Sequence, residues 1–392
     1  MRTWIRSAVA LAAMMVTGMA GAQELIVEKK VFELPSFTTQ SGRTLKQVRV
    51  GWESYGTLNA DKSNAVLICH FFSGNSHAAG KYDAKDAQPG YWDAIIGPGK
   101  AIDTDRYFVI ASDTLVNLNT GDPKTTTTGP ATIDPDTGKP YGLDFPIVTI
   151  RDFVEVQKAL VESLGIKKLA LVAGPSMGSL QTFEWAARHP EMVAKAMPVI
   201  GAAEADAMLI GWLDVWAAPI LVDPDWNKGD YYGKAPPLAG LAKALTAVTL
   251  HANHQEWADA TFARRPAKAD EDPGMTLAAK FQVQSVLDNA GMARARLSDA
   301  NHFLYLVKAN QLFAAGGTSL ADGMAKIRAP MLYITQPKDL VFTAETVAAT
   351  LKAAKDAGRD ITHVTIDGVR GHLDGVISMK QAEGAIRAFL AR

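Results

Sequence analysis

The chain has 392 residues, of which 48% are hydrophobic, and it carries a formal net charge of −1. This length is enough to bury a large core, as one large domain or as a domain with an insertion, and the balanced charge argues against nucleic acid as a partner. A single cysteine excludes an internal disulfide, and histidines and cysteines never cluster at zinc-ligand spacing, so we expect no metal and no cofactor.

The N-terminal segment has the pattern of a secretory signal peptide. Arg2 and Arg6 precede an apolar stretch at residues 8–19, and small residues follow it. We therefore predict a signal peptide at residues 1–22, cleaved after Ala22, and a mature protein that is periplasmic or secreted. The alternative is an uncleaved membrane anchor, but the apolar run is short for a span, so we expect no stable membrane insertion after cleavage.

The next part of the chain contains several candidate strands. Alternating apolar and polar residues at 47–54 predict an antiparallel edge strand, and 25–32 is a weaker candidate. The runs 65–69 and 107–111 are continuously apolar, as expected of central parallel strands. Cys69, at the end of the first run, is interpreted as a core residue and not as a second nucleophile. The Thr-, Gly- and Pro-rich segment 118–140 is expected to be a long surface loop.

A strand, a glycine-flanked serine and a helix follow one another before Pro190. The run 169–173 is typical of a buried strand, and 180–189 is typical of a helix. Between them lies the sequence G-x-S-x-G at residues 174–178, which at a strand-to-helix turn is the nucleophile elbow of α/β-hydrolases. The glycines allow a sharp turn, and the helix N-terminus favours developing negative charge. Ser176 is therefore the predicted nucleophile.

The α/β alternation stops after the strand predicted at 196–200 and resumes near residue 328. Tryptophans, prolines and helical stretches fill the interval, and strands are again predicted at 331–334 and 363–366. We predict an α/β-hydrolase fold with a mostly parallel central sheet and an inserted helical lid. Its divisions are the signal peptide (1–22), the hydrolase core (23–200 and 328–392) and the lid (201–327).

A serine nucleophile needs a histidine base and an acid that orients the base, in the chain order Ser, Asp or Glu, His. Asp339 comes just after the strand at 331–334, and His372 comes after the strand at 363–366. Both positions are at the carboxyl edge of a parallel sheet, where catalytic loops lie. We predict that Ser176, Asp339 and His372 form a catalytic triad.

Other residues compete for these roles. Asp339 could be a turn residue, and Asp367 and Asp374 are rival acids on the histidine's own loop. His372 could be a surface imidazole, and His363 is the rival base, although its place inside a strand limits its reach. The remaining candidates for pocket lining are His70, His77, His251 and His254.

An oxyanion hole requires two backbone donors. One is expected from Met177, the residue after the nucleophile. The other is expected from the loop after the strand at 65–69, where we choose Phe72, although Phe71 and Phe72 could simply cover core. Lid aromatics such as Trp212 and Trp216 are expected to bind substrate.

Several stretches resemble the homoserine O-acetyltransferase family of α/β-hydrolases, from about residue 50 to the C-terminus. They are residues 70–77 (HFFSGNSH), 97–107 (GPGKAIDTDRY), 138–146 (GKPYGLDFP), 176–185 (SMGSLQTFEW) and 299–306 (DANHFLYL). The resemblance implies the triad and the two oxyanion donors chosen above. It also implies a lid that often builds a dimer, so a homodimer through the lid is one expected assembly.

The sequence departs from this family pattern at the elbow and in the lid. The family's elbow reads Gly-Gly-Ser-Met-Gly-Gly, whereas here Pro175 precedes the serine and Ser179 follows the last glycine. In the lid, Leu245 stands where the family has an arginine that holds the amino acid's carboxylate. Losing that contact removes on the order of 2–3 kcal/mol of binding, which disfavours homoserine as acceptor. Leu245 is a predicted substrate-binding residue, and the candidate replacements for the arginine are Lys243, Arg264 and Arg265.

These observations predict an exported serine hydrolase that cleaves a small-molecule carboxylic ester through an acyl-enzyme on Ser176. Export would separate the enzyme from cytoplasmic acyl-CoA and favours water as the acceptor. The alternative is an O-acyltransferase, similar to homoserine O-acetyltransferase, that moves an acyl group from acyl-CoA to an alcohol. A secreted binding protein on a retired hydrolase scaffold is a third hypothesis, and the intact order of Ser, Asp and His argues against it.

Overall fold

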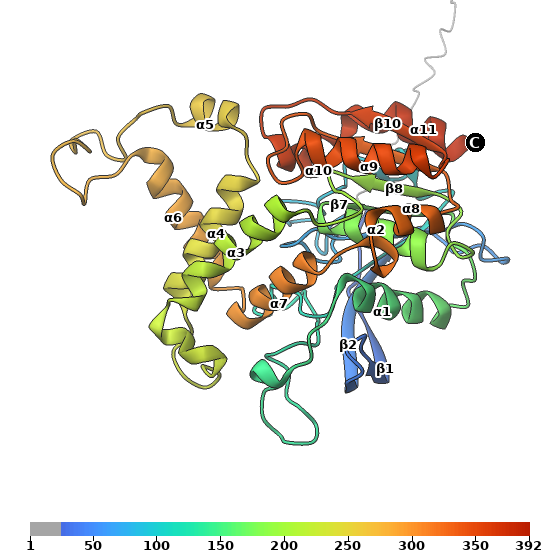
Figure 1. The fold of residues 1–392 in the computed structure, drawn as a ribbon, viewed down its shortest axis with the longest axis horizontal. Helices are drawn as coiled ribbons and strands as arrows, with labels where there is room; N and C mark the ends of the chain where they lie inside the picture. Colours follow the sequence, from blue (N-terminus) through green and yellow to red (C-terminus); the bar gives the residue numbers. More distant parts are fainter. Residues whose placement is uncertain (1–24) are drawn as a thin grey trace, which may run out of the picture.

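An eight-stranded sheet forms the centre of the molecule in the computed structural model, which describes residues 25–392 (Figure 1). The strand order is β1-β2-β6-β3-β7-β8-β9-β10. Strands β6, β3, β7, β8, β9 and β10 run parallel to one another, whereas β2 is antiparallel to both of its neighbours, β1 and β6. This is the predicted mostly parallel α/β-hydrolase sheet. The strands are β1 (Lys30–Thr38), β2 (Thr44–Tyr55), β3 (Ala65–Cys69), β6 (Phe108–Ser112), β7 (Leu171–Pro175), β8 (Ala196–Val199), β9 (Met331–Thr335) and β10 (Ile361–Thr365), with a separate pair β4 (Ile96–Gly97) and β5 (Ile102–Asp103).

The predicted signal peptide at 1–22 lies outside the described residues. Among the helices that are described, none combines the length and the hydropathy that a bilayer crossing requires.

The expected edge strand at 47–54 is not at the edge. This segment belongs to β2, which pairs with β1 on one side and with β6 on the other, and β1 is the edge strand. The weaker candidate at 25–32 overlaps only the start of β1. The prediction was wrong because alternating apolar and polar residues indicate only that one face of a strand is buried. The alternation does not indicate whether the strand pairs with one neighbouring strand or with two.

Two hydrophobic clusters cover the two faces of the sheet. Leu67 and Val172 point into the cluster that contains residues of α1 and α2, whereas their neighbours Ile68 and Leu171 point into the cluster that contains Ile386 of α11. Successive strand residues alternate between the faces, so continuously apolar strands are buried on both sides. The helices are α1 (Ile150–Ser163), α2 (Met177–Arg188), α3 (Ala207–Leu221), α4 (Leu238–His251), α5 (Gln255–Thr261), α6 (Gln282–Ala295), α7 (Ala300–Gln311), α8 (Leu320–Lys326), α9 (Ala344–Asp356), α10 (Asp374–Ile377) and α11 (Glu383–Ala391).

The segment between β8 and β9 is helical, and most of it stands beside the sheet. Figure 1 shows α3 to α6 grouped on one side, with α3 against α4 and α7 and with α4 against α6. The last helix of the segment, α8, packs instead against α2 and α9. On α3, Met208, Val215 and Leu221 leave apolar surface exposed. The homodimer through the lid stays a prediction.

Polar contacts of α7 fasten the lid to the loop after β6. The carboxylate of Asp299 accepts hydrogen bonds from the backbone N–H of His302 (2.9 Å) and from the Tyr231 hydroxyl (2.8 Å). The ring of His302 is buried and lies 2.8 Å from the carbonyl oxygen of Asn117 through Nδ1, while Nε2 accepts from the N–H of Ala131. The stretch 299–306 therefore anchors the lid.

Candidate active site

Ser176 occupies a sharp turn between β7 and α2. Its φ and ψ are 57° and −120°, a strained conformation for a residue with a side chain, and its N–H donates to the carbonyl of Val199 at 2.9 Å. A Cβ atom at Gly174 or Gly178 would lie 2.4 or 2.1 Å from the carbonyl oxygen of Cys69. The two glycines are thus needed for close packing of the turn on β3, and the strain falls on the serine. The helix begins at Met177, three residues earlier than predicted, so its N-terminus adjoins the serine.

The side chains of Ser176, His372 and Asp339 form a chain of hydrogen bonds. His372 Nε2 lies 2.8 Å from Ser176 Oγ, and His372 Nδ1 lies 2.8 Å from Asp339 Oδ2. The ionised acid can only accept, so Nδ1 carries the proton and Nε2 accepts from the serine hydroxyl. The other oxygen of Asp339 accepts from the N–H groups of Val341 (2.7 Å) and Phe342 (3.0 Å). All three side chains are almost fully buried.

The rival acids and the rival base have other partners. Asp367 is exposed, and Asp374 accepts a hydrogen bond from the Gln336 amide at 3.1 Å. His363 bonds through Nε2 to the hydroxyl of Thr335 on the neighbouring strand at 2.7 Å. None of these groups forms a hydrogen bond with the imidazole of the relay. In residues 25–392, no group of His, Cys, Asp and Glu has an arrangement that could hold a metal ion.

The backbone N–H groups of Phe72 and Met177 have no acceptor in the described part of the chain. Met177 is the first residue of α2, whose first N–H groups have no partner within the helix. The ring of Phe72 is wedged edge-on between Trp216 of α3 and Phe303 of α7, with centroids 5.6 and 5.2 Å apart. Phe72 therefore covers core with its side chain and still leaves a free backbone donor beside the serine's turn.

His70 is not a pocket-lining residue; its ring nitrogens stabilise this loop through hydrogen bonds. Its Nδ1 donates to the carbonyl of Phe71 at 2.7 Å, and its Nε2 accepts from the N–H of Thr114 at 3.2 Å. Complete burial lowers the pKa of His70 to about 4, so the ring is neutral at neutral pH and can donate and accept at once. Of the other histidines chosen for pocket lining, His77 lines a separate cavity and His254 caps α5. His251 stacks on Trp212.

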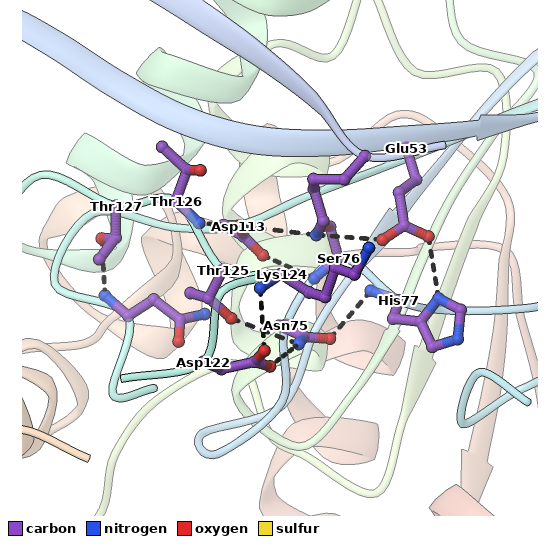
Figure 2. A network of polar contacts seen from close by, with 12 residues as sticks. Glu53, Asn75, Ser76, His77, Asp113, Asp122, Lys124, Thr125, Thr126 and Thr127 are labelled. Carbon is purple, nitrogen blue, oxygen red and sulfur yellow. Dashed lines mark hydrogen bonds and ion pairs between the residues drawn. The ribbon is translucent and has the colours of Figure 1, made fainter. Parts of the chain in front are cut away.

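A buried polar network, drawn in Figure 2, fixes the rest of the loop. Glu53 is fully buried, and Figure 2 shows its carboxylate beside His77, whose Nδ1 lies 3.1 Å away. The carboxylate also lies 3.0 Å from Lys29 Nζ and 2.5 Å from the Tyr82 hydroxyl. Burial alone would raise the pKa of Glu53, but these hydrogen bonds and the lysine charge outweigh it and hold the pKa below the ordinary 4.5. Glu53 is therefore ionised at neutral pH.

The same network joins this loop to the segment after β6. Asp113 is buried and accepts hydrogen bonds from the N–H of Ser76 (2.7 Å) and of Thr126 (2.9 Å), as Figure 2 shows. Lys29 Nζ lies 3.7 Å from its carboxylate. The loop that carries Phe72 is thus held at both ends, by His70 and by this network.

Glu53→Gln is expected to lower the free energy of unfolding by on the order of 3 kcal/mol at pH 7, because it removes the closer of the two carboxylates that pair with Lys29 and leaves only Asp113 at 3.7 Å. Since the pKa of Glu53 is lowered by folding, its contribution is present above pH 4.5 and is lost as the pH falls through the folded pKa. Urea unfolding of both proteins at pH 7 and pH 3 measures this difference. A difference of the same size at both pH values would contradict the assignment.

Glu33→Gln is the control for this comparison. Glu33 lies on the edge strand β1 and forms an exposed ion pair with Arg49 at 2.9 Å. Its removal is expected to change the unfolding free energy by less than about 1 kcal/mol.

A cavity of about 250 Å³ opens onto the relay and is mostly apolar. Trp216 lines it, as expected. Trp212 and Leu245 do not: Trp212 is 39% exposed and stacks on His251, and Leu245 is fully buried among the lid helices. The cavity is lined by Phe71, Phe72, Ser73, Ser176, Trp216, Val248, Thr249, Ala252, Arg294, Val341, His372, Leu373 and Val376.

One basic side chain lines this cavity, and sequence reasoning missed it. Arg294 on α6 reaches the wall, whereas none of the three basic residues considered as replacements for the family's arginine does. Lys243 pairs with Asp288 on the surface at 2.5 Å, and Arg264 lies over the ring of Phe281 at 5.4 Å. Arg265 bonds to Gln282 in an exposed position. The sequence signal for Arg294 was helical periodicity, since position 294 lies seven residues after the buried Leu287 of the same helix.

Comparison with known proteins agrees with the fold. A family model described as the alpha/beta hydrolase fold matches residues 64–367. The homoserine O-acetyltransferase of Methanohalobium evestigatum is 38% identical over 93% of this chain and 73% of its own length.

Solved structures of two kinds of enzyme superpose well on the chain. The crystal structure of esterase E22 is 49% identical, with a TM-score of 0.89, and the match covers 93% of this chain and all of that one. Homoserine O-acetyltransferase from Bacillus anthracis is 34% identical, with a TM-score of 0.88, covering 94% and 98%. The chain therefore belongs to the homoserine O-acetyltransferase family of α/β-hydrolases and is an enzyme of the acyl-transferring or ester-cleaving kind.

Proposed function

We propose that the protein is a serine esterase that transfers the acyl group of a carboxylic ester to Ser176 and then to water. The observation that carries this proposal is the buried chain of hydrogen bonds from Asp339 through His372 to Ser176, which ends at the cavity. A serine hydroxyl is a weak nucleophile at neutral pH and needs such a base. The arrangement supports acyl transfer through a covalent intermediate.

Acylation begins with attack of Ser176 Oγ on the ester carbonyl carbon. His372 Nε2 takes the hydroxyl proton, and Asp339 keeps the resulting imidazolium oriented through Nδ1. The carbonyl oxygen becomes an oxyanion that accepts hydrogen bonds from the free N–H groups of Phe72 and Met177. Collapse of the tetrahedral intermediate breaks the ester C–O bond, and the alcohol leaves with the proton from His372.

Deacylation repeats these steps with water. His372 Nε2 takes a proton from a water molecule, whose oxygen attacks the acyl carbon, and the same two N–H groups hold the second oxyanion. The carboxylic acid then leaves, and the proton returns to Ser176 Oγ. Transferase and hydrolase chemistry differ only in whether water or an acceptor alcohol performs this attack.

The cavity wall favours hydrolysis of an ester with an apolar part. Most of its side chains are aromatic or aliphatic, including Trp216, Val341 and Leu373. Apolar walls bind acyl or alkyl groups through burial of surface. The similarity to esterase E22 supports the same choice, and so does the proposed export signal at 1–22, which would place the enzyme away from acyl-CoA.

The second candidate is transfer of an acyl group from acyl-CoA to an alcohol such as homoserine. The names of the curated relatives favour this candidate over hydrolysis. It uses the same acyl-enzyme and the same relay, so only the deacylating nucleophile distinguishes the two reactions.

Measuring how the acyl-enzyme partitions decides between the candidates. The mature protein is supplied with p-nitrophenyl acetate alone, with p-nitrophenyl acetate plus homoserine, and with acetyl-CoA plus homoserine. We expect acetate as the main product of the first two mixtures and little transfer in the third. O-acetylhomoserine formed faster than acetate would reverse the order of the candidates, and Ser176→Ala serves as the blank for each mixture.

A further inference from the structure

Arg294 introduces a cation into the cavity that holds the serine and the histidine. It lies in the last turn of α6, and its side chain lines the same cavity as Ser176 and His372. Guanidinium Nη1 donates a hydrogen bond to Thr249 Oγ1 of α4 at 2.8 Å. Thr249 Oγ1 in turn donates to the carbonyl of Leu245, so the lid helices position the guanidinium.

No carboxylate in residues 25–392 forms an ion pair with this guanidinium, and Nη1–Thr249 is its one side-chain hydrogen bond there. Other arginines of the chain behave differently: Arg151 lies 3.3 Å from Glu184, and Arg387 lies 2.6 Å from Glu383. Burial lowers the pKa of Arg294, with no acidic neighbour to oppose the effect. Even partial burial of a cation without a counter-ion is unfavourable, and the side chain lines the cavity while the other N–H donors of its planar fork have no partner in residues 25–392.

We propose that Arg294 binds a free carboxylate carried by the substrate, so that the preferred substrate is an ester of small size with an anionic end. This proposal rests on the esterase function above and names the substrate class of the same site. A planar guanidinium matches a carboxylate geometrically and forms two charge-assisted hydrogen bonds with it. The remaining wall is mostly apolar, so the single cation would fix the direction in which the ester enters, with its carbonyl toward Ser176.

A matched pair of esters tests this assignment. The mono-p-nitrophenyl ester of glutaric acid carries a free carboxylate, and p-nitrophenyl butyrate is a neutral ester of similar length. We expect the wild-type protein to favour the charged ester in kcat/KM. In Arg294→Met, the ratio of kcat/KM for the charged ester to that for the neutral ester is expected to fall on the order of 10- to 100-fold, as for loss of a charge-assisted hydrogen bond.

Two further variants separate recognition from a structural role. Arg294→Lys retains the charge without the planar fork and is expected to restore part of the ratio. Arg296→Met, at the exposed end of the same helix and outside the cavity, is expected to keep the wild-type ratio. An unchanged ratio in Arg294→Met, or an equal fall in Arg296→Met, would overturn the proposal.

Calorimetry with glutarate gives a readout that does not depend on turnover. Saturable binding to the wild-type protein that is lost in Arg294→Met supports the carboxylate site, and absence of binding to the wild-type protein contradicts it. If the wild-type protein hydrolyses neither ester, the proposed esterase function fails, while glutarate binding still decides the role of Arg294. If it hydrolyses the neutral ester without any charge preference, only the Arg294 proposal fails.

Discussion

Ser176→Ala is expected to lower kcat for ester hydrolysis on the order of 10⁶-fold, the effect that loss of a triad nucleophile has in serine hydrolases. The residual rate should come from water attacking an ester held by the cavity and by the free N–H groups of Phe72 and Met177. Steady-state hydrolysis of p-nitrophenyl acetate measures the change. Circular dichroism and thermal unfolding verify that the variant is folded.

His372→Ala and the double variant complete this test. Because the base and the nucleophile act as one unit, His372→Ala should lose about as much activity as Ser176→Ala, and the double variant should lose little more. His363→Ala, the rival base on β10, serves as the matched control. Additive losses in the double variant, or near wild-type rates in either single variant, would show that the hydrogen-bonded relay is not the reacting unit.

Asp339→Asn is expected to lower kcat about 10⁴-fold with little change in fold. The amide can present an N–H to His372 Nδ1, which stabilises the tautomer with the proton on Nε2 and leaves no acceptor for the hydroxyl proton of Ser176. One side-chain oxygen remains for the N–H groups of Val341 and Phe342, so the loop keeps its anchor. The pH-rate profile and kcat of the variant measure the effect.

The rival acid supplies the control for this substitution. Asp367 lies on the histidine's own loop but is exposed and does not contact the imidazole. Asp367→Asn should therefore keep kcat near the wild-type value. If Asp367→Asn were the damaging change and Asp339→Asn were harmless, the assignment of the acid would be wrong.

The relay could be predicted from sequence because local patterns and topology constrain it. A strand, a glycine-flanked serine and a helix define the turn at Ser176 without any tertiary information. Asp339 and His372 then follow from the rule that loops at the carboxyl ends of parallel strands meet at one edge of the sheet. These residues are far apart in the chain, but the order of the strands leaves few alternatives.

The cavity wall could not be predicted in the same way. Trp212 and Trp216 share one face of α3, yet only Trp216 reaches the cavity, because the docking of α3 on α4 and α7 decides which turn of the helix is covered. Arg294 was missed because helical periodicity places it on the same face as the buried Leu287 but does not show that this face of α6 adjoins the cavity. The position of β2 inside the sheet was missed for a related reason, because pairing on its second side depends on the distant strand β6.

Active-site labelling reports directly whether His372 activates Ser176 as a nucleophile. The protein is treated with an alkyl fluorophosphonate, which phosphonylates an activated serine irreversibly, and the labelled peptide is identified by mass spectrometry. We expect a single adduct on Ser176 that forms quickly in the wild-type protein and very slowly in His372→Ala. An unlabelled Ser176 in a preparation that hydrolyses esters, or an equally fast adduct without His372, would contradict this expectation.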